Sequence, residues 1–135
     1  METAASMLVV DDDPDIRQTL AELLSESGRR VATARDGFDA LDKLDSLERP
    51  CVILLDLMMP RMSGLEFLDH LSQQPGLEDV QVIVMSANDG LRRQAEGHSI
   101  VRAALRKPFD FDGLLCLVDG REATSSRSSE WSALQ

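Results

Sequence analysis

The feature that most constrains the fold is the segment Cys51 to Gly64, with the sequence CVILLDLMMPRMSG. It opens with an uninterrupted apolar run, Cys51 to Leu55, which is typical of a strand buried on both faces of a parallel sheet. The run ends in a single carboxylate, Asp56, and the turn residues Pro60 and Gly64 follow. We therefore expect Asp56 at the carboxyl end of a central strand, on the sheet edge where ligands bind in open α/β folds.

Other apolar runs alternate with amphipathic helical patterns along the chain. The predicted strands are Met7–Val10, Val31–Ala34, Cys51–Leu55, Val82–Met85 and Val101–Leu105. The predicted helices begin at Pro14, at Gly37 (to about Leu47), at Leu65, at Asp89, and after Asp110 or Asp112. Asp13 and Asp36 are expected to cap the first two helices, and Ile16 and Phe38 are expected on their apolar faces. This alternation predicts an α/β fold with one parallel sheet covered by helices on both faces.

The composition limits the kinds of partner. The chain has 135 residues, which suits one domain, and its formal net charge of -10 argues against a nucleic-acid-binding surface and suits a cation site. Two cysteines, Cys51 and Cys116, form no zinc or redox motif, so we expect them to be reduced. No apolar run is long enough to cross a membrane, and the N-terminus lacks a signal-peptide pattern. We expect a soluble, cytoplasmic protein without membrane insertion.

Chemically important side chains follow the predicted strands. Because the carboxyl ends of parallel strands share one edge, Asp11, Asp12, Asp56, Ser86 and Lys107 should converge on one cleft. Three carboxylates side by side disfavour one another's charge, and a hard divalent cation such as Mg2+ relieves that conflict. A carboxylate nucleophile, a metal, a lysine and a hydroxyl donor are the parts that phosphoryl transfer requires.

The chain resembles the receiver domains of two-component response regulators. The resemblance rests on VVDDDPDIR, LLDLMMPRMSGLEFL, VMSA and RKPFD, which occur in the family's order, and it extends from about Ser6 to Val118. It implies a flavodoxin-like (βα)5 fold, a doubly wound sheet of five parallel strands in the order 2-1-3-4-5. We expect a receiver domain over residues 1–120, followed by a flexible serine-rich tail or the start of a linker over residues 121–135.

The resemblance also implies a role for each site residue. Asp56 would accept a phosphoryl group from a sensor histidine kinase or a histidine phosphotransfer protein. The implied Mg2+ ligands are the carboxylates of Asp11, Asp12 and Asp56 and the backbone carbonyl of Met58, with Asp11 acting mostly through water. Lys107 would contact the phosphoryl group and precede Pro108 through a cis peptide bond, and Ser86 would move toward the phosphoryl oxygens in the active state. The protein would be a signalling phosphoacceptor and not a turnover enzyme.

Ala104 departs from the family pattern, because an aromatic residue is usual three positions before the lysine. The output would reach a downstream protein target or a missing effector domain. An apolar Met58 beside the acceptor favours slow to moderate dephosphorylation, and we expect a monomer before phosphorylation.

The alternative function is a receiver-like interaction module that works without phosphorylation. A phosphatase with an aspartyl nucleophile is disfavoured because it would need a second Asp where Met58 stands. His70 and His98 have no second ligand at metal spacing and are expected on the surface.

Overall fold

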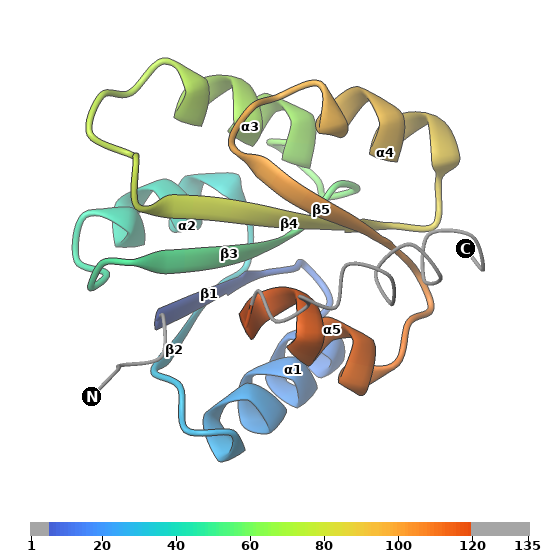
Figure 1. Ribbon diagram of the computed structural model, residues 1–135. Helices are drawn as coiled ribbons and strands as arrows, with labels where there is room; N and C mark the ends of the chain where they lie inside the picture. The colour runs from blue at the N-terminus through green and yellow to red at the C-terminus, as the bar shows by residue number, and fades with distance from the viewer. Residues whose placement is uncertain (1–5, 120–135) are drawn as a thin grey trace.

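The computed structural model describes residues 6–119, which form five strands and five helices in strict alternation (Figure 1). The strands are β1 Ser6–Val10, β2 Val31–Ala34, β3 Cys51–Asp56, β4 Val80–Ser86 and β5 Val101–Arg106. The helices are α1 Pro14–Glu26, α2 Gly37–Leu44, α3 Gly64–Ser72, α4 Asp89–Glu96 and α5 Phe111–Asp119. The predicted serine-rich tail lies outside the described residues.

All strand pairs are parallel, and the sheet order is β2-β1-β3-β4-β5, as the resemblance implied. Helices α1 and α5 cover one face of the sheet, and α2, α3 and α4 cover the other (Figure 1). The register pairs Val10 with Leu55 and Asp56 with Met85, so the strands end nearly level. The residues that follow these ends therefore meet at one edge, which we call the carboxyl edge; the opposite edge is the amino edge.

The central strand contributes to two hydrophobic cores because successive side chains point to opposite faces. Ile53 and Leu55 pack in the core under α2, α3 and α4, whereas Val52 and Leu54 pack in the core under α1 and α5. All of β3 is buried. The uninterrupted apolar run predicted this, since a strand with one solvated face would alternate with polar residues.

Side chains at the first turns fix where the helices begin. The Asp13 carboxylate accepts hydrogen bonds from the backbone N–H groups of Asp15 and Ile16, and the Asp36 carboxylate accepts one from Asp39. Both predicted caps are confirmed. Two further caps follow β3 and β4: Ser63 forms a capping box at α3, and Asn88 caps α4. The first four helices thus start at residues that side-chain caps define, which also fixes the loops before them.

Two predicted buried residues are exposed. Phe38 is 54% exposed because the buried stripe of α2 consists of Gly37, Ala40 and Leu44, and Phe38 lies off that stripe. Ile16 is 37% exposed because α1 buries Leu20 and Leu24, whereas Ile16 sits in the first turn at the carboxyl edge. Helix α2 also ends at Leu44, earlier than the predicted Leu47.

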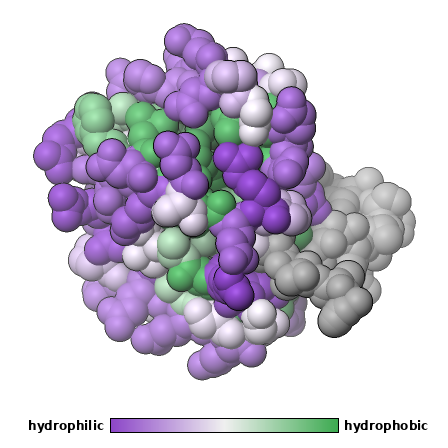
Figure 2. Space-filling view, turned by 90° about the vertical axis from the view of Figure 1, so that its left-hand side faces the viewer, coloured by the Kyte–Doolittle hydropathy of each residue, from purple (hydrophilic) through white to green (hydrophobic). Residues whose placement is uncertain are grey.

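The surface is mostly hydrophilic. Figure 2 shows the face at the left of Figure 1, where polar residues surround smaller hydrophobic areas. Within residues 6–119, none of the helices has the length and apolar character needed to cross a membrane. Neither Cys51, which is buried, nor Cys116, which is half-buried, forms a disulfide in the described chain.

Candidate functional site

A cluster of carboxylates lies at the carboxyl edge. Asp11 and Asp12 follow β1, Asp56 ends β3, and one oxygen from each lies within 4.8 Å of the others. Asp11 is fully buried and Asp56 is 5% exposed, whereas Asp12 is open to solvent. The sequence predicted that these three residues would meet, and they do. Together they form a compact set of hard oxygen donors with one side accessible from outside.

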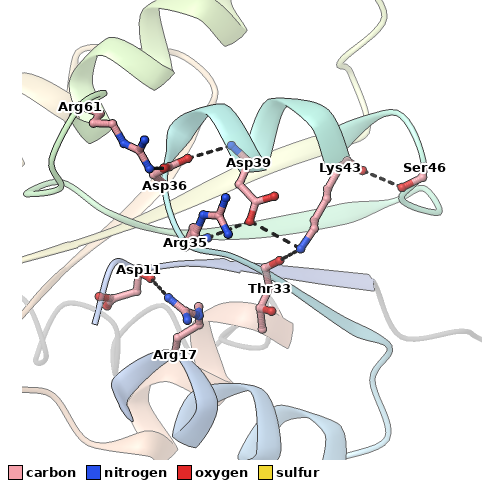
Figure 3. Close-up of polar contacts among 9 residues, drawn as sticks. All are labelled: Asp11, Arg17, Thr33, Arg35, Asp36, Asp39, Lys43, Ser46 and Arg61. Carbon is pink, nitrogen blue, oxygen red and sulfur yellow. Dashed lines mark hydrogen bonds and ion pairs between the residues drawn. The ribbon is translucent and has the colours of Figure 1, made fainter. Parts of the chain in front are cut away.

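Backbone contacts hold Asp11 in place. Its Oδ1 accepts a hydrogen bond from the backbone N–H of Asp13 at 2.9 Å, and its own N–H donates to Ala34 of β2. Figure 3 shows Arg17 reaching back from α1 to the Asp11 main chain, where Nη1 donates to the carbonyl at 2.8 Å. The arginine therefore anchors the backbone of Asp11 and leaves the carboxylate facing Asp56.

Asp56 is held in an environment that disfavours its charge. Burial, and then the neighbouring charge of Asp11, raise the pKa of Asp56 to about 6. The Met58 N–H, which donates to Asp56 Oδ1 at 3.1 Å, and the charge of Lys107 lower this pKa but do not cancel the rise. A cation bound between the carboxylates would favour the ionised form, so the site is electrostatically prepared for one.

Lys107 supplies the positive charge that faces this cluster. Its Nζ lies 3.3 Å from Asp11 Oδ2 and 3.6 Å from Asp56 Oδ1, and its side chain is 25% exposed. Its N–H donates to the Ser86 carbonyl, which fixes it against the end of β4. The peptide bond to Pro108 is cis, as the resemblance implied.

Ser86 is buried at the end of β4, one residue beyond the partner of Asp56 in the sheet. Its Oγ accepts a hydrogen bond from the Asn88 N–H at 3.0 Å. Its carbonyl accepts one from the Lys107 N–H at 3.1 Å and one from Arg92 Nη1 at 3.0 Å. The backbone of Ser86 is thus tied both to Lys107, which directly follows β5, and to α4.

The loop between β3 and α3 carries the remaining predicted residue, Met58. Its side chain is 59% exposed, and its N–H points to Asp56. Arg61, farther along the loop, forms an ion pair with the buried Asp36 at 2.9 Å (Figure 3). Sequence analysis missed both contacts: Arg61 stands inside LLDLMMPRMSGLEFL, but its partner Asp36 lies 25 positions away, and Arg92 lies outside the quoted motifs. The sequence predicted Asp36 as an N-cap, but its burial, and with it the need of its carboxylate for a partner, is visible only in the structure.

The histidines take no part in the acidic cluster. His70 is exposed on α3, and His98 lies with Nε2 3.6 Å from Asp69 Oδ1. Among residues 6–119, the group of potential metal ligands found at this edge consists of aspartates alone.

Comparison with known proteins agrees with this geometry. Residues 7–119 match the family described as the response regulator receiver domain. The chain is 37% identical over 110 residues to the protein PilG of Pseudomonas aeruginosa, which covers 81% of each chain. It is 38% identical to the response regulator MprA of Mycobacterium avium, of which it spans 47%.

The fold also matches solved structures. The response regulator protein TrrA from Thermotoga maritima, in complex with Mg2+-BeF, superposes with a TM-score of 0.70 and 33% sequence identity. That match covers 82% of this chain and 93% of TrrA.

Proposed function

Because this chain belongs to the response regulator receiver domains of two-component systems, we propose that it is a phosphoacceptor switch in which Asp56 is the acceptor. The observation that carries the proposal is the meeting of three aspartates with Lys107 at the carboxyl edge. We propose a sensor histidine kinase or a histidine phosphotransfer protein as the donor. A receiver domain over residues 1–120 in the cytoplasm, with a flexible serine-rich tail or linker start over residues 121–135, completes the proposal.

Mg2+ fits the donor set. Two buried carboxylates and one exposed carboxylate lie within reach of one another, and Mg2+ prefers a few such oxygens together with water. The solved TrrA complex supports the same assignment. The proposed ligands are Asp11, Asp12, Asp56 and the Met58 carbonyl, with Asp11 acting mostly through water. When bound, Mg2+ neutralises charge on the carboxylates and on the incoming phosphoryl oxygens.

Phosphoryl transfer then follows from the residues of the chain. A carboxylate oxygen of Asp56 attacks phosphorus, the bond from phosphorus to the donor histidine nitrogen breaks, and that nitrogen keeps the electron pair. Lys107, already beside Asp56, stabilises the negative charge on the phosphoryl oxygens. With its pKa at about 6, Asp56 is mostly ionised at neutral pH and remains a nucleophile.

A phosphoryl group on Asp56 would attract the Ser86 hydroxyl. This hydroxyl can donate to a phosphoryl oxygen, and a displacement of Ser86 would disturb the hydrogen bond from Asn88 and thus the cap of α4. Local electrostatics at Asp56 would in this way change the surface near α4, which meets a downstream protein or an effector domain. Ala104, partly buried in the core beneath α4, is too small to act as an aromatic switch. This residue favours the second candidate, an interaction module that works without phosphorylation.

Labelling with acetyl phosphate tests the proposal. Intact mass is measured with and without Mg2+ for the wild type, for Asp56→Asn, and for the exposed control Asp69→Asn. A single phosphoryl adduct that needs Mg2+, disappears in Asp56→Asn and persists in the control is expected. Failure to form any adduct, under conditions that label an ordinary receiver, would favour the phosphorylation-independent module.

A further inference from the structure

The loop between β3 and α3 closes on itself immediately after the acceptor. The Gly64 N–H donates to the Leu57 carbonyl at 3.1 Å, and a Cβ on Gly64 would lie 2.6 Å from Leu57 Cα. The Leu57 N–H also donates to Met85 of β4. Both ends of the loop are therefore fixed, and the path of residues 58–63 decides where the Met58 backbone lies relative to Asp56.

Arg61 is the strained point of that path. Its φ is 67°, whereas glycine is the residue that ordinarily accepts a positive φ. The Met62 N–H donates to the Pro60 carbonyl at 2.7 Å, two residues back, so Arg61 is the centre of a γ-turn with positive φ. Such turns are rare and persist where surrounding contacts hold them.

The contacts that hold this turn come from the start of α2. Arg61 Nη2 lies 2.9 Å from Asp36 Oδ2, and the Asp36 side chain is 6% exposed (Figure 3). The other oxygen of Asp36 accepts the Asp39 N–H, so the carboxylate cannot swing with the loop. Met62, the next residue, packs so closely on Gly37 that a Cβ there would lie 2.5 Å from its sulfur. Two adjacent loop residues are thus held against the N-cap and the first residue of α2.

The charge of Asp36 is stabilised in the folded chain. The hydrogen bond from Asp39, and the nearby charges of Arg61 and Arg35, hold the pKa of Asp36 below its usual value although burial opposes this. Asp36 is therefore an ionised anchor at neutral pH. Within residues 6–119, its side chain bonds to Asp39 and Arg61 and to no residue of the acidic cluster.

We propose that the Arg61–Asp36 ion pair is a positioning device for the acceptor loop, holding the strained turn so that the Met58 backbone stays in place beside Asp56. This role rests on the proposed function, because it presupposes that Mg2+ and the phosphoryl group bind beside Asp56. Neither residue touches the phosphoryl group. They act through the path of the loop. Substitutions at the pair should therefore weaken Mg2+ binding more than a loss of folding stability alone would explain.

The test measures Mg2+ affinity of the unphosphorylated protein by isothermal titration calorimetry, beside the Mg2+ dependence of labelling by acetyl phosphate. Arg61→Ala and Asp36→Asn should each weaken Mg2+ binding by about tenfold, as loss of supporting contacts does at other metal sites. Asn retains the capping oxygen, so α2 should still form. The double variant should be no weaker than either single one, because both remove the same ion pair.

Three further variants distinguish loss of the Arg61–Asp36 ion pair from other causes of weaker Mg2+ binding. Arg35→Ala also removes one positive charge near Asp36, but it leaves the loop between β3 and α3 unchanged. This variant should bind Mg2+ like the wild type. Arg61→Lys, which keeps the charge, should recover part of the affinity. Arg61→Gly accepts a positive φ and guards against misfolding, but it loses the anchor on Asp36, so its Mg2+ binding should still be weaker than that of the wild type.

The outcomes distinguish failure of the positioning role from failure of the phosphoacceptor function. If the wild type is labelled and Arg61→Ala, or Arg61→Gly, binds Mg2+ normally, the positioning role is wrong and the phosphoacceptor function stands. Equal weakening in Arg35→Ala would also overturn it, since the cause would be general charge. If the wild type itself neither binds Mg2+ nor accepts a phosphoryl group, the proposed function fails, and this role fails with it.

Discussion

The two edges of the sheet differ in whether their charged side chains are buried. At the carboxyl edge, Asp11, Asp36, Asp56 and Ser86 are buried, and three of them are carboxylates. At the amino edge, the buried polar residue is the neutral Ser6, whose hydroxyl donates to the Glu48 carbonyl, whereas the charged contacts include an exposed ion pair between Arg30 and Glu48 and a hydrogen bond from Arg102 to Gln81. Buried charge is costly, whereas exposed charge is nearly neutral in its effect on stability.

The difference shows where the molecule gives up stability. At the amino edge, water can satisfy the polar groups of the loops that lead into the strands. At the carboxyl edge, one lysine faces two buried carboxylates, and the pKa of Asp56 is raised because that environment disfavours its charge. An arrangement that is unfavourable without a ligand and favourable with a cation belongs to a binding site. The same edge also contains the strained turn at Arg61.

The largest expected effect concerns close packing at the carboxyl edge. In Gly64→Ala, the new Cβ would meet Leu57 Cα at 2.6 Å and the Asp56 carbonyl oxygen at 2.7 Å, and backbone atoms cannot rotate away. We expect a loss of about 2–3 kcal/mol in the free energy of unfolding, as overpacking produces. Urea denaturation measures it.

A glycine at the amino edge is the matched control. In Gly97→Ala the nearest atom to the new Cβ is the Gln94 carbonyl oxygen at 3.3 Å, and Gly97 has a φ of -71°. The change should stay within about 0.5 kcal/mol. Equal losses at the two positions would contradict the view that the carboxyl edge is the constrained one.

The next effect concerns charge. Asp56 has a folded pKa of about 6, above its usual 3.8, so the protonated form is favoured by folding. Its contribution to stability is fully present below pH about 4 and is lost as the pH rises through about 6. Asp56→Asn, which stays neutral, should therefore be more stable than the wild type at pH 7 without Mg2+, by about 2 kcal/mol.

The pH dependence checks the cause. The advantage of Asp56→Asn should shrink as the pH falls from 7 to 4, in urea denaturation with a chelator present, because the wild-type carboxyl becomes neutral too. Mg2+ at pH 7 should stabilise the wild type more than the variant. A variant that is less stable than the wild type at pH 7 in chelator would refute the idea that Asp56 is electrostatically strained.

The strands and the meeting of the aspartates could be predicted from the sequence for a simple reason. Apolar runs that end in polar residues define parallel strands, and parallel strands deliver those residues to one edge, so Asp11, Asp12 and Asp56 meet whatever the details of the loops. Asp13 and Asp36 were predictable as caps because capping is local.

Contacts between loops were not predictable in this way. The pairing of Arg61 with Asp36 depends on how two loops pass each other, and nothing in the spacing of 25 positions between them encodes it. Phe38 was placed wrongly on the buried face because hydrophobicity alone does not say which helical residues meet the sheet; Gly37, Ala40 and Leu44 occupy that face. Side-chain roles that cross between elements need the packed structure.

The smallest expected effect lies at the amino edge. Arg30 and Glu48 form an ion pair, but their side chains are 75% and 65% exposed, so water screens the attraction and both side chains lose freedom on pairing. Glu48→Gln should change the free energy of unfolding by less than about 0.5 kcal/mol. The Glu48 carbonyl, which accepts the Ser6 hydroxyl, belongs to the backbone and is unaffected. Urea denaturation at low and high salt, with Asp36→Asn measured in parallel, would show whether an ion pair matters more where one carboxylate is buried. If Glu48→Gln proved as damaging as Asp36→Asn, burial would not be what separates the two edges.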